Sequence, residues 1–226
     1  MRFILFDIDG TLIDSGGAGV RALNLAFEEM FSVADAFGTI SMAGKTDLQI
    51  VTEGLELHNL EISNGKVPDF LGRYLRHLRN TINAAKGHVK AGVRSALDRL
   101  SAQDDIVLGL LTGNIEPGAM IKLGAFGLEE YFDVGAFGDD DADRNRLLPI
   151  ALEKLRKKRD VELDFRDCVV IGDTPRDIEC SKPFGAYAIA VATGPYSFGI
   201  LSDAGADAVF HDLSDTNKFL DAVKNR

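Results

Sequence analysis

Short apolar runs that alternate with amphipathic segments constrain the fold of this 226-residue chain more than any other feature. The runs are bounded by Gly, Asp or Thr and cover residues 3–6, 106–111, 134–137, 169–171, 186–191 and 208–210. They are apolar along almost their whole length, which is typical of strands buried on both faces of a parallel sheet. Between them, residues 93–100 and 147–155 place apolar side chains on one helical face. The pattern predicts an α/β fold with a doubly wound parallel-sheet (Rossmann-like) core.

One long segment breaks this alternation. Residues from about 15 to 88 contain no convincing strand and show helical patterns instead, within 20–31, 48–55 and 70–82. Because a structureless connection of that length is abnormal inside a sheet domain, we expect an inserted α-helical cap domain. The predicted boundaries are 1–15 and 89–226 for the discontinuous core and 16–88 for the cap.

Polar side chains follow three of the predicted strands at the point where each strand ends. They are Asp7 and Asp9 after the first run, Thr112, Gly113 and Asn114 after the run 106–111, and Asp173 and Asp177 after the run 169–171. Since ligands bind beside the carboxyl ends of strands in open α/β sheets, we expect these groups to converge. Converging carboxylates favour a hard dication, and Mg²⁺ fits best because it uses few protein carboxylates together with water and phosphate. Each piece alone could be a turn or a helix cap, so the prediction depends on their combination.

The charge balance argues against two classes of partner. A net charge of −10 disfavours non-specific nucleic-acid binding, which needs a basic stripe, and binding to an anionic membrane surface. We find no signal peptide and no apolar run near the ~20 residues of a membrane span, so we expect a cytoplasmic protein. An acidic protein that handles an anionic substrate needs local positive charge, from a metal or from placed Lys and Arg.

The stretch FDIDGTLID, residues 6–14, resembles the first motif of the haloacid dehalogenase-like (HAD) superfamily. LLTGN at 110–114 is similar to the second motif of that family, VIGDTPRD at 170–177 to its fourth, and AGVRSALDRL at 91–100 to the return from its cap. The cap loop and the overall layout resemble phosphoglycolate-phosphatase-like members. The resemblance implies a Mg²⁺-dependent phosphatase that acts through an aspartyl-phosphate intermediate. The substrate that it implies is a small phosphomonoester, that is, a small phosphorylated metabolite.

The same resemblance implies a role for each motif residue. Asp7 is the expected nucleophile, and Asp9 is the expected general acid and base. The implied metal ligands are Asp7, Asp9 through its backbone carbonyl, Asp173 and Asp177, with Asp177 expected farther from the ion. The implied phosphate-binding residues are Thr112, Gly113 and Asn114.

The third motif departs from the family pattern. The family usually places a Lys just before the helix that precedes the fourth motif, but residues 138–155 read GDDDADRNRLLPIALEKL, without a Lys at that point. Arg144 and Arg146 are the available cations. We favour Arg144 because it lies just ahead of a plausible helix cap at Asn145, and Arg146 stays open because helix boundaries are hard to place. The expected role is to bind phosphate and to neutralise charge on Asp7.

The loop MAGKTDLQI, residues 42–50, is the expected source of substrate contacts from the cap. Family caps often place such a loop over the active site, so Lys45 and Thr46 are predicted to contact substrate. The alternative for Lys45 is a solvated side chain ahead of a Thr46 helix cap, and we weigh the two interpretations equally.

Other functions stay open beside the phosphatase. A phosphosugar mutase shares every core motif found here. A haloacid dehalogenase needs neither Asp9 nor the pair Asp173 and Asp177, and a phosphonate hydrolase needs a Schiff-base lysine, for which Lys45 is a candidate. A non-enzymatic binding module is disfavoured because nucleophile, acid, hydroxyl and metal ligands are all present.

Overall fold

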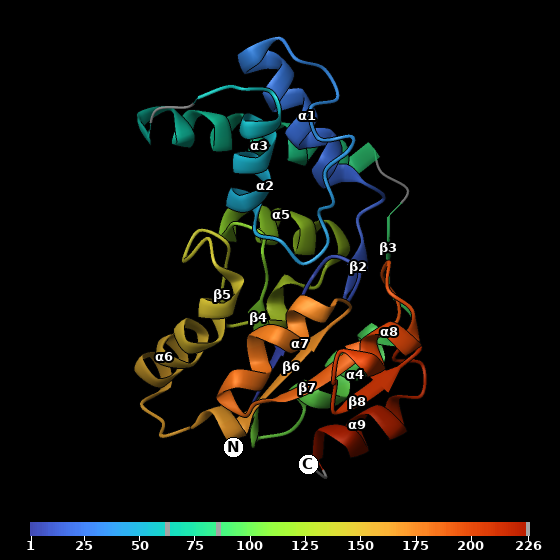
Figure 1. Ribbon diagram of the computed structural model, residues 1–226. Coiled ribbons are helices and arrows are strands. Elements are labelled where there is room, and N and C mark those ends of the chain that lie inside the picture. The colour runs from blue at the N-terminus through green and yellow to red at the C-terminus, as the bar shows by residue number, and fades with distance from the viewer. Residues whose placement is uncertain (62–63, 85–86, 225–226) are drawn as a thin grey trace.

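The computed structural model describes residues 1–61, 64–84 and 87–224. Within these residues, a six-stranded parallel sheet has the order β5-β4-β1-β6-β7-β8 (Figure 1). Its strands are β1 (Arg2–Phe6), β4 (Ile106–Leu111), β5 (Val134–Ala136), β6 (Cys168–Gly172), β7 (Tyr187–Val191) and β8 (Ala208–Phe210). Every predicted strand is present, and the α/β fold class is confirmed. The chain adds strands on one side of β1 and then on the other, so the order reverses beside β1, where ligands bind in such sheets.

Strand β1 shows why the runs are apolar along their whole length. Ile4 and Phe6 enter one hydrophobic core, and Phe3 and Leu5 enter a second core on the opposite face. The first face is covered by α4 (Val93–Ser101), α5 (Glu116–Phe126) and α9 (Thr216–Lys224), and the second by α6 (Leu147–Arg159), α7 (Pro175–Ser181) and α8 (Phe198–Asp203). A strand between two helical layers has no solvent-facing side and needs apolar residues at successive positions.

A helical layer stands over one end of the sheet, at the top of Figure 1. It contains α1 (Ala18–Phe31), α2 (Asp47–Leu57), the short turn η1 (Asn64–Lys66) and α3 (Val67–Ala84). The helices agree with the three predicted helical patterns, and their buried side chains, among them Phe27, Phe70 and Tyr74, form a separate hydrophobic cluster. Residues 62, 63, 85 and 86 of the predicted cap lie outside the described residues.

A two-stranded antiparallel ribbon marks the crossings into and out of this layer. In it, β2 (Ile13–Asp14) pairs with β3 (His88–Val89), with Ile13 opposite Val89 and Asp14 opposite His88. The ribbon was not predicted, because strands of two residues carry no periodicity in the sequence. Short 3₁₀ turns connect other elements: η2 (Glu129–Tyr131), η3 (Arg144–Arg146), η4 (Phe165–Asp167) and η5 (Lys182–Phe184).

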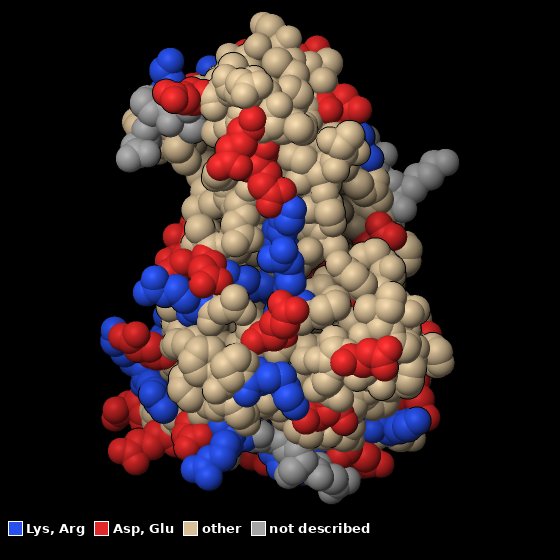
Figure 2. Space-filling model, viewed as in Figure 1, with Lys and Arg blue, Asp and Glu red and all other residues tan. Residues whose placement is uncertain are grey.

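Figure 2 shows acidic and basic side chains interspersed over the sheet half of the face in view, and fewer charges over the helical layer. Among the described residues, we find no helix with the length and apolar character that crossing a membrane requires.

Candidate active site

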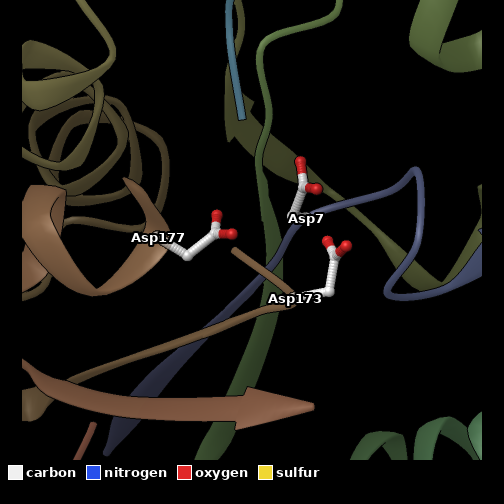
Figure 3. Close-up of side chains that lie close together, drawn as sticks. All are labelled: Asp7, Asp173 and Asp177. Carbon is white, nitrogen blue, oxygen red and sulfur yellow. The ribbon is translucent and has the colours of Figure 1, made fainter. Parts of the chain in front are cut away.

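Asp7, Asp173 and Asp177 meet at the carboxyl edge of the sheet (Figure 3). The Asp7 backbone N–H donates to the carbonyl of Ile171 at 2.9 Å, which ties the end of β1 to its neighbour β6. Asp173 directly follows β6, and Asp177 lies in the first turn of α7. One oxygen of each carboxylate lies within 4.8 Å of the others, and all three residues are buried. The structure thus brings these three predicted residues together.

Burial and nearby negative charges disfavour the ionised forms of Asp7 and Asp173. Burial raises the pKa of Asp7 to about 6, the charges of Asp177 and Asp9 add to the increase, and Arg144 opposes it. The pKa of Asp173 lies well above its usual value because of burial first and the charges of Asp7 and Asp177 second. A divalent cation beside Asp7 and Asp173 would offset both effects.

Asp177 differs from the other two acids because both of its oxygens already accept hydrogen bonds. Oδ2 accepts from the backbone N–H of Thr174 at 3.0 Å and from the Thr174 hydroxyl at 2.7 Å, in the capping box that starts α7. Oδ1 accepts from the Arg144 guanidinium. These bonds compete with direct coordination by Asp177, so Asp7 and Asp173 are better placed to hold a metal.

Two glycines allow the backbone to close around Asp173. A Cβ atom at Gly10 would lie 2.3 Å from Asp173 Oδ2, and a Cβ atom at Gly194 would lie 1.6 Å from the same oxygen. Gly10 also has a φ of 86°, in the left-handed region that favours glycine. The chain can therefore turn sharply after Asp9 and pack tightly against the carboxylate.

Arg144, and not Arg146, is the cation beside Asp7. Arg144 Nη2 lies 3.2 Å from Asp7 Oδ1 and also contacts Asp177. Burial lowers the pKa of Arg144, but the charges of Asp177 and Asp7 outweigh burial and raise it above its usual value. The Arg146 side chain is 71% exposed and pairs with Asp141.

The predicted helix cap at Asn145 is wrong. The turn η3 begins beside Asp143, whose carboxylate accepts a hydrogen bond from the Asn145 backbone N–H at 3.0 Å, and α6 begins only at Leu147. The segment is therefore capped two residues earlier than expected, because the acidic side chain precedes a 3₁₀ turn and not the α-helix itself.

Lys122 of α5 is a site residue that the sequence analysis missed. Its ammonium lies 2.5 Å from Asp9 Oδ2 and 2.6 Å from Asn114 Oδ1, and its side chain is only 5% exposed. Burial raises the pKa of Asp9, but the charge and hydrogen bond of Lys122 outweigh burial, together with the bonds from Asn114 and Ser15, and lower the pKa overall. The signal in the sequence was a lone charge: Lys122 is the one charged residue between 117 and 128. A lysine on such an apolar helix rarely becomes buried without a partner.

Asn114 links Thr112 to this ion pair. Thr112 is fully buried, and its hydroxyl oxygen accepts a hydrogen bond from the Asn114 side-chain amide at 2.8 Å. The same amide donates to Asp9 Oδ2 at 3.0 Å. The phosphate-binding role of Thr112, Gly113 and Asn114 stays a prediction.

The start of α2 reaches across from the helical layer to the loop after β4. The Asp47 backbone N–H donates to the Gly113 carbonyl at 2.7 Å. The Asp47 carboxylate accepts from the Ile115 backbone N–H at 2.9 Å and is itself buried. Hydrogen bonds thus join the helical layer to the loop after β4, which carries predicted site residues.

Lys45 and Thr46 directly precede α2, and their side chains have different hydrogen-bond partners. Thr46 is the N-cap of α2, and its hydroxyl also donates to the Ala142 carbonyl at 2.9 Å. The Lys45 ammonium lies 2.5 Å from Glu53, and its side chain is 14% exposed. Lys45 is therefore not a solvated side chain, and its contact with substrate stays a prediction.

A cavity of about 320 Å³ connects these groups. Asp7, Asp9 and Thr112 line it from the loops after β1 and β4, Arg144 lines it from η3, and Lys45, Asp47 and Tyr74, among others, line it from the helical layer. Two carboxylates, one of them paired with an ammonium, and an arginine thus line one cavity.

Comparison with known protein families shows to which family the chain belongs. Residues 4–191 match the model of the haloacid dehalogenase-like hydrolases. The chain belongs to this family. It is 29% identical over 212 residues to the plasmid phosphoglycolate phosphatase of Cupriavidus necator, covering 93% of this chain and 89% of the relative. It is 27% identical over 197 residues to the phosphoglycolate phosphatase of Xanthomonas campestris, covering 85% and 84%.

Two solved structures share the fold. CbbY from Rhodobacter sphaeroides, solved in complex with phosphate, superposes with a TM-score of 0.73 at 18% identity, covering 95% of this chain and 96% of CbbY. A putative beta-phosphoglucomutase from Thermotoga maritima gives a TM-score of 0.65 at 22% identity, covering 99% and 100%. The resemblance stated from the sequence motifs is confirmed.

Proposed function

We propose that this hydrolase is a Mg²⁺-dependent phosphatase that cleaves a small phosphomonoester through an aspartyl-phosphate intermediate. The observation that carries the proposal is the surroundings of Asp7, a buried carboxylate at the end of β1 with Arg144 at 3.2 Å and Asp173 close by. The names of the relatives from Cupriavidus and Xanthomonas support the same chemistry. Phosphoryl transfer depends mainly on positioning and on stabilising negative charge, and a cavity lined by Asp7 and Arg144 can provide both.

Asp7 and Asp9 divide the chemistry between them. A carboxylate oxygen of Asp7 attacks phosphorus, and the bond from phosphorus to the alcohol oxygen breaks while Asp9 donates a proton to that oxygen. Water then attacks the aspartyl-phosphate, Asp9 takes the proton of that water, and Asp7 is released together with inorganic phosphate. Both residues line the same cavity, so both can reach one bound phosphoryl group.

The ion pair with Lys122 changes the pKa of Asp9 and thereby its protonation state. In the free site the lysine lowers the pKa of Asp9 and favours its ionised form. A phosphate dianion bound next to Asp9 adds like charge, which favours the protonated acid again. Asp9 is thereby protonated when a leaving group needs its proton, and ionised when it acts as base.

The residues fit a Mg²⁺ ion. The donors would be the carboxylate oxygens of Asp7 and Asp173, which lie close together, and the backbone carbonyl oxygen of Asp9. Burial first, and the charges of Asp7 and Asp177 second, raise the pKa of Asp173, and a bound cation would offset both effects. When bound, the ion supplies positive charge to the nucleophile and to the phosphoryl oxygens. The groups proposed to bind the remaining phosphoryl oxygens are Thr112, Gly113, Asn114 and Arg144.

Residues 16–88 act in this proposal as a cap over the core of residues 1–15 and 89–226. The separate hydrophobic cluster of α1, α2 and α3 supports this division, and so does the β2–β3 ribbon at the two crossings. Lys45 contacts substrate from the cap, and Thr46 holds the loop in place.

Removing the metal is expected to abolish turnover. After dialysis against EDTA, the rate of hydrolysis of 4-nitrophenyl phosphate should fall about 100-fold or more, and added Mg²⁺ should restore it. Phosphorus NMR of a phosphosugar reaction separates the alternative, because a phosphatase releases inorganic phosphate whereas a mutase isomerises the ester. Full turnover in the chelator would contradict the proposed metal dependence.

Gly113→Ala is expected to disturb the closed position of the cap loop. A Cβ atom at Gly113 would lie 2.0 Å from the Lys45 carbonyl oxygen and 3.0 Å from the Thr46 Cα, and these are backbone atoms that cannot rotate away. We expect kcat/KM for 4-nitrophenyl phosphate to fall roughly 10- to 100-fold, because small misplacements in an active site are costly. Gly72→Ala in α3 is the matched control, since a Cβ atom there meets nothing within 4 Å, and its kinetics should not change.

A further inference from the structure

One face of α5, together with its N-cap Ile115, contacts polar groups of α2, α3 and the loop after β1. Positions 115, 118 and 122 fall on the same helical face. The Ile115 N–H binds the Asp47 carboxylate at 2.9 Å, the Tyr74 hydroxyl lies 3.7 Å from where a Gly118 Cβ would be, and Lys122 pairs with Asp9. Asp47, Tyr74 and Lys122 all line the cavity, and we call these three residues the cap-side cluster.

Tyr74 supplies the observation that points to a ligand. Its side chain is fully buried, and among the residues that the structure describes its hydroxyl finds no hydrogen-bond partner. A buried hydroxyl without a partner is unfavourable, so such groups are usually satisfied by protein, water or ligand. Because Tyr74 lines the cavity, a bound molecule can provide the missing partner.

The charge around the cap-side cluster opposes an anionic leaving group. Asp9 and Asp47 bring two carboxylates, and Lys122 brings one ammonium that already bonds Asp9 and Asn114. Burial raises the pKa of Asp47 to about 6, with Lys122 opposing, so Asp47 is mostly ionised at pH 7.5. The cap's Lys45 is paired with Glu53 at 2.5 Å, and its charge is largely compensated.

Apolar side chains also line the cavity. Val20 and Leu23 of α1 and Ile50 of α2 line it from the cap. Apolar side chains of this kind suit the carbon chain of a leaving group, while the few polar groups fix its orientation.

We propose that the cap-side cluster binds an uncharged, hydroxyl-bearing leaving group, so that phosphate esters of polyols are favoured over phosphate esters of hydroxy acids. This inference rests on the proposed phosphatase function. A hydroxyl of the leaving group can accept a hydrogen bond from Tyr74 and donate one to Asp47. A carboxylate can accept from Tyr74 but has no proton for Asp47, and it meets the charge of Asp47 instead. The preference differs from the hydroxy-acid ester for which the relatives from Cupriavidus and Xanthomonas are named.

A matched pair of esters tests the preference. Glycerol 3-phosphate and 3-phosphoglycerate differ in having a terminal CH₂OH or a carboxylate. At pH 7.5 with Mg²⁺, we expect kcat/KM to be about 10-fold or more higher for glycerol 3-phosphate. Asp47→Asn removes the opposing charge but keeps an oxygen acceptor for the Ile115 N–H, so the ratio of the two kcat/KM values should fall about 10-fold. Tyr74→Phe should lower kcat/KM for glycerol 3-phosphate more than for 4-nitrophenyl phosphate.

The controls are Asp69→Asn on the exposed surface of α3 and Tyr131→Phe, whose hydroxyl bonds Asp98 outside the cavity. Neither should change the ratio. A wild-type preference for 3-phosphoglycerate, or an Asp47→Asn ratio equal to that of the wild type, would overturn the inference. Failure to hydrolyse any phosphate ester would instead overturn the proposed function. In that case the affinities of the wild-type protein for the two esters, measured by calorimetry, still test the inference. Tighter binding of glycerol 3-phosphate supports it, and tighter binding of 3-phosphoglycerate contradicts it.

Discussion

Asp7→Asn is expected to abolish hydrolysis of 4-nitrophenyl phosphate without unfolding the protein. The amide has nearly the same shape as the carboxylate, but it is a poor nucleophile, so no aspartyl-phosphate can form. Loss of a group that forms the covalent intermediate should lower kcat by about 1000-fold or more. Steady-state release of inorganic phosphate measures the loss, and Asp221→Asn on the exposed side of α9 is the control that should retain full activity. A kcat within tenfold of the wild-type value would remove Asp7 from the role of nucleophile.

The same variant also tests the electrostatics of the site. The pKa of Asp7 is raised from 3.8 to about 6, so the stability linked to its neutral form is present below about pH 4 and is lost as the pH rises through about 6. At about pH 8, burial and the charges of Asp177 and Asp9 make the ionised Asp7 carboxylate unfavourable in the folded protein. A neutral asparagine does not lower the stability in this way. In metal-free buffer the melting temperature of Asp7→Asn should therefore equal or exceed that of the wild type at pH 8. The advantage should shrink towards pH 4, and a lower melting temperature at pH 8 would contradict the account.

The sheet could be predicted from the sequence because burial on both faces leaves a local trace. The buried residues of β1, Phe3 to Phe6, are all apolar, and helices that cover such a strand must carry one apolar face. The β2–β3 ribbon leaves no such trace, because its two-residue strands are defined by their pairing and not by their composition. The predicted helix cap at Asn145 is wrong for a related reason. A 3₁₀ turn precedes α6, and the side chain that caps this turn is Asp143.

The site divides in the same way. Asp7, Asp173 and Asp177 could be placed together because each follows a strand of one parallel sheet, and topology brings such ends to one edge. Lys122, Asp47 and Tyr74 lie on helices, and their importance comes from which helix packs against which. Tyr74 falls in the apolar stripe of α3, but its side chain lines the cavity, and among the described residues its buried hydroxyl has no hydrogen-bond partner. Partnerships between elements distant in sequence, such as Asp9 with Lys122, have no signature in a single chain beyond an isolated charge.

Lys122→Met is expected to weaken both the fold and the chemistry. The methionine keeps the volume of the side chain but removes the ammonium that bonds Asp9 and Asn114. Breaking a fully buried pair costs roughly 3–5 kcal/mol. The Asp9 side chain is 39% exposed to the cavity and can be hydrated there, so we expect a smaller loss of roughly 1–3 kcal/mol in the free energy of unfolding. Urea denaturation measures this loss.

The kinetic effect separates a positioning role from simple packing. Without Lys122, Asp9 and Asn114 lose their shared anchor, and we expect kcat for 4-nitrophenyl phosphate to fall about 10- to 100-fold. Lys182→Met is the matched control, because Lys182 pairs with Asp207 at 2.7 Å while 42% exposed, away from the cavity. That surface pair should contribute less than about 1 kcal/mol and leave kcat unchanged. If both variants lost equal stability and both retained kcat, Lys122 would be a packing residue, and the orientation of Asp9 would have to come from Ser15 and Asn114 alone.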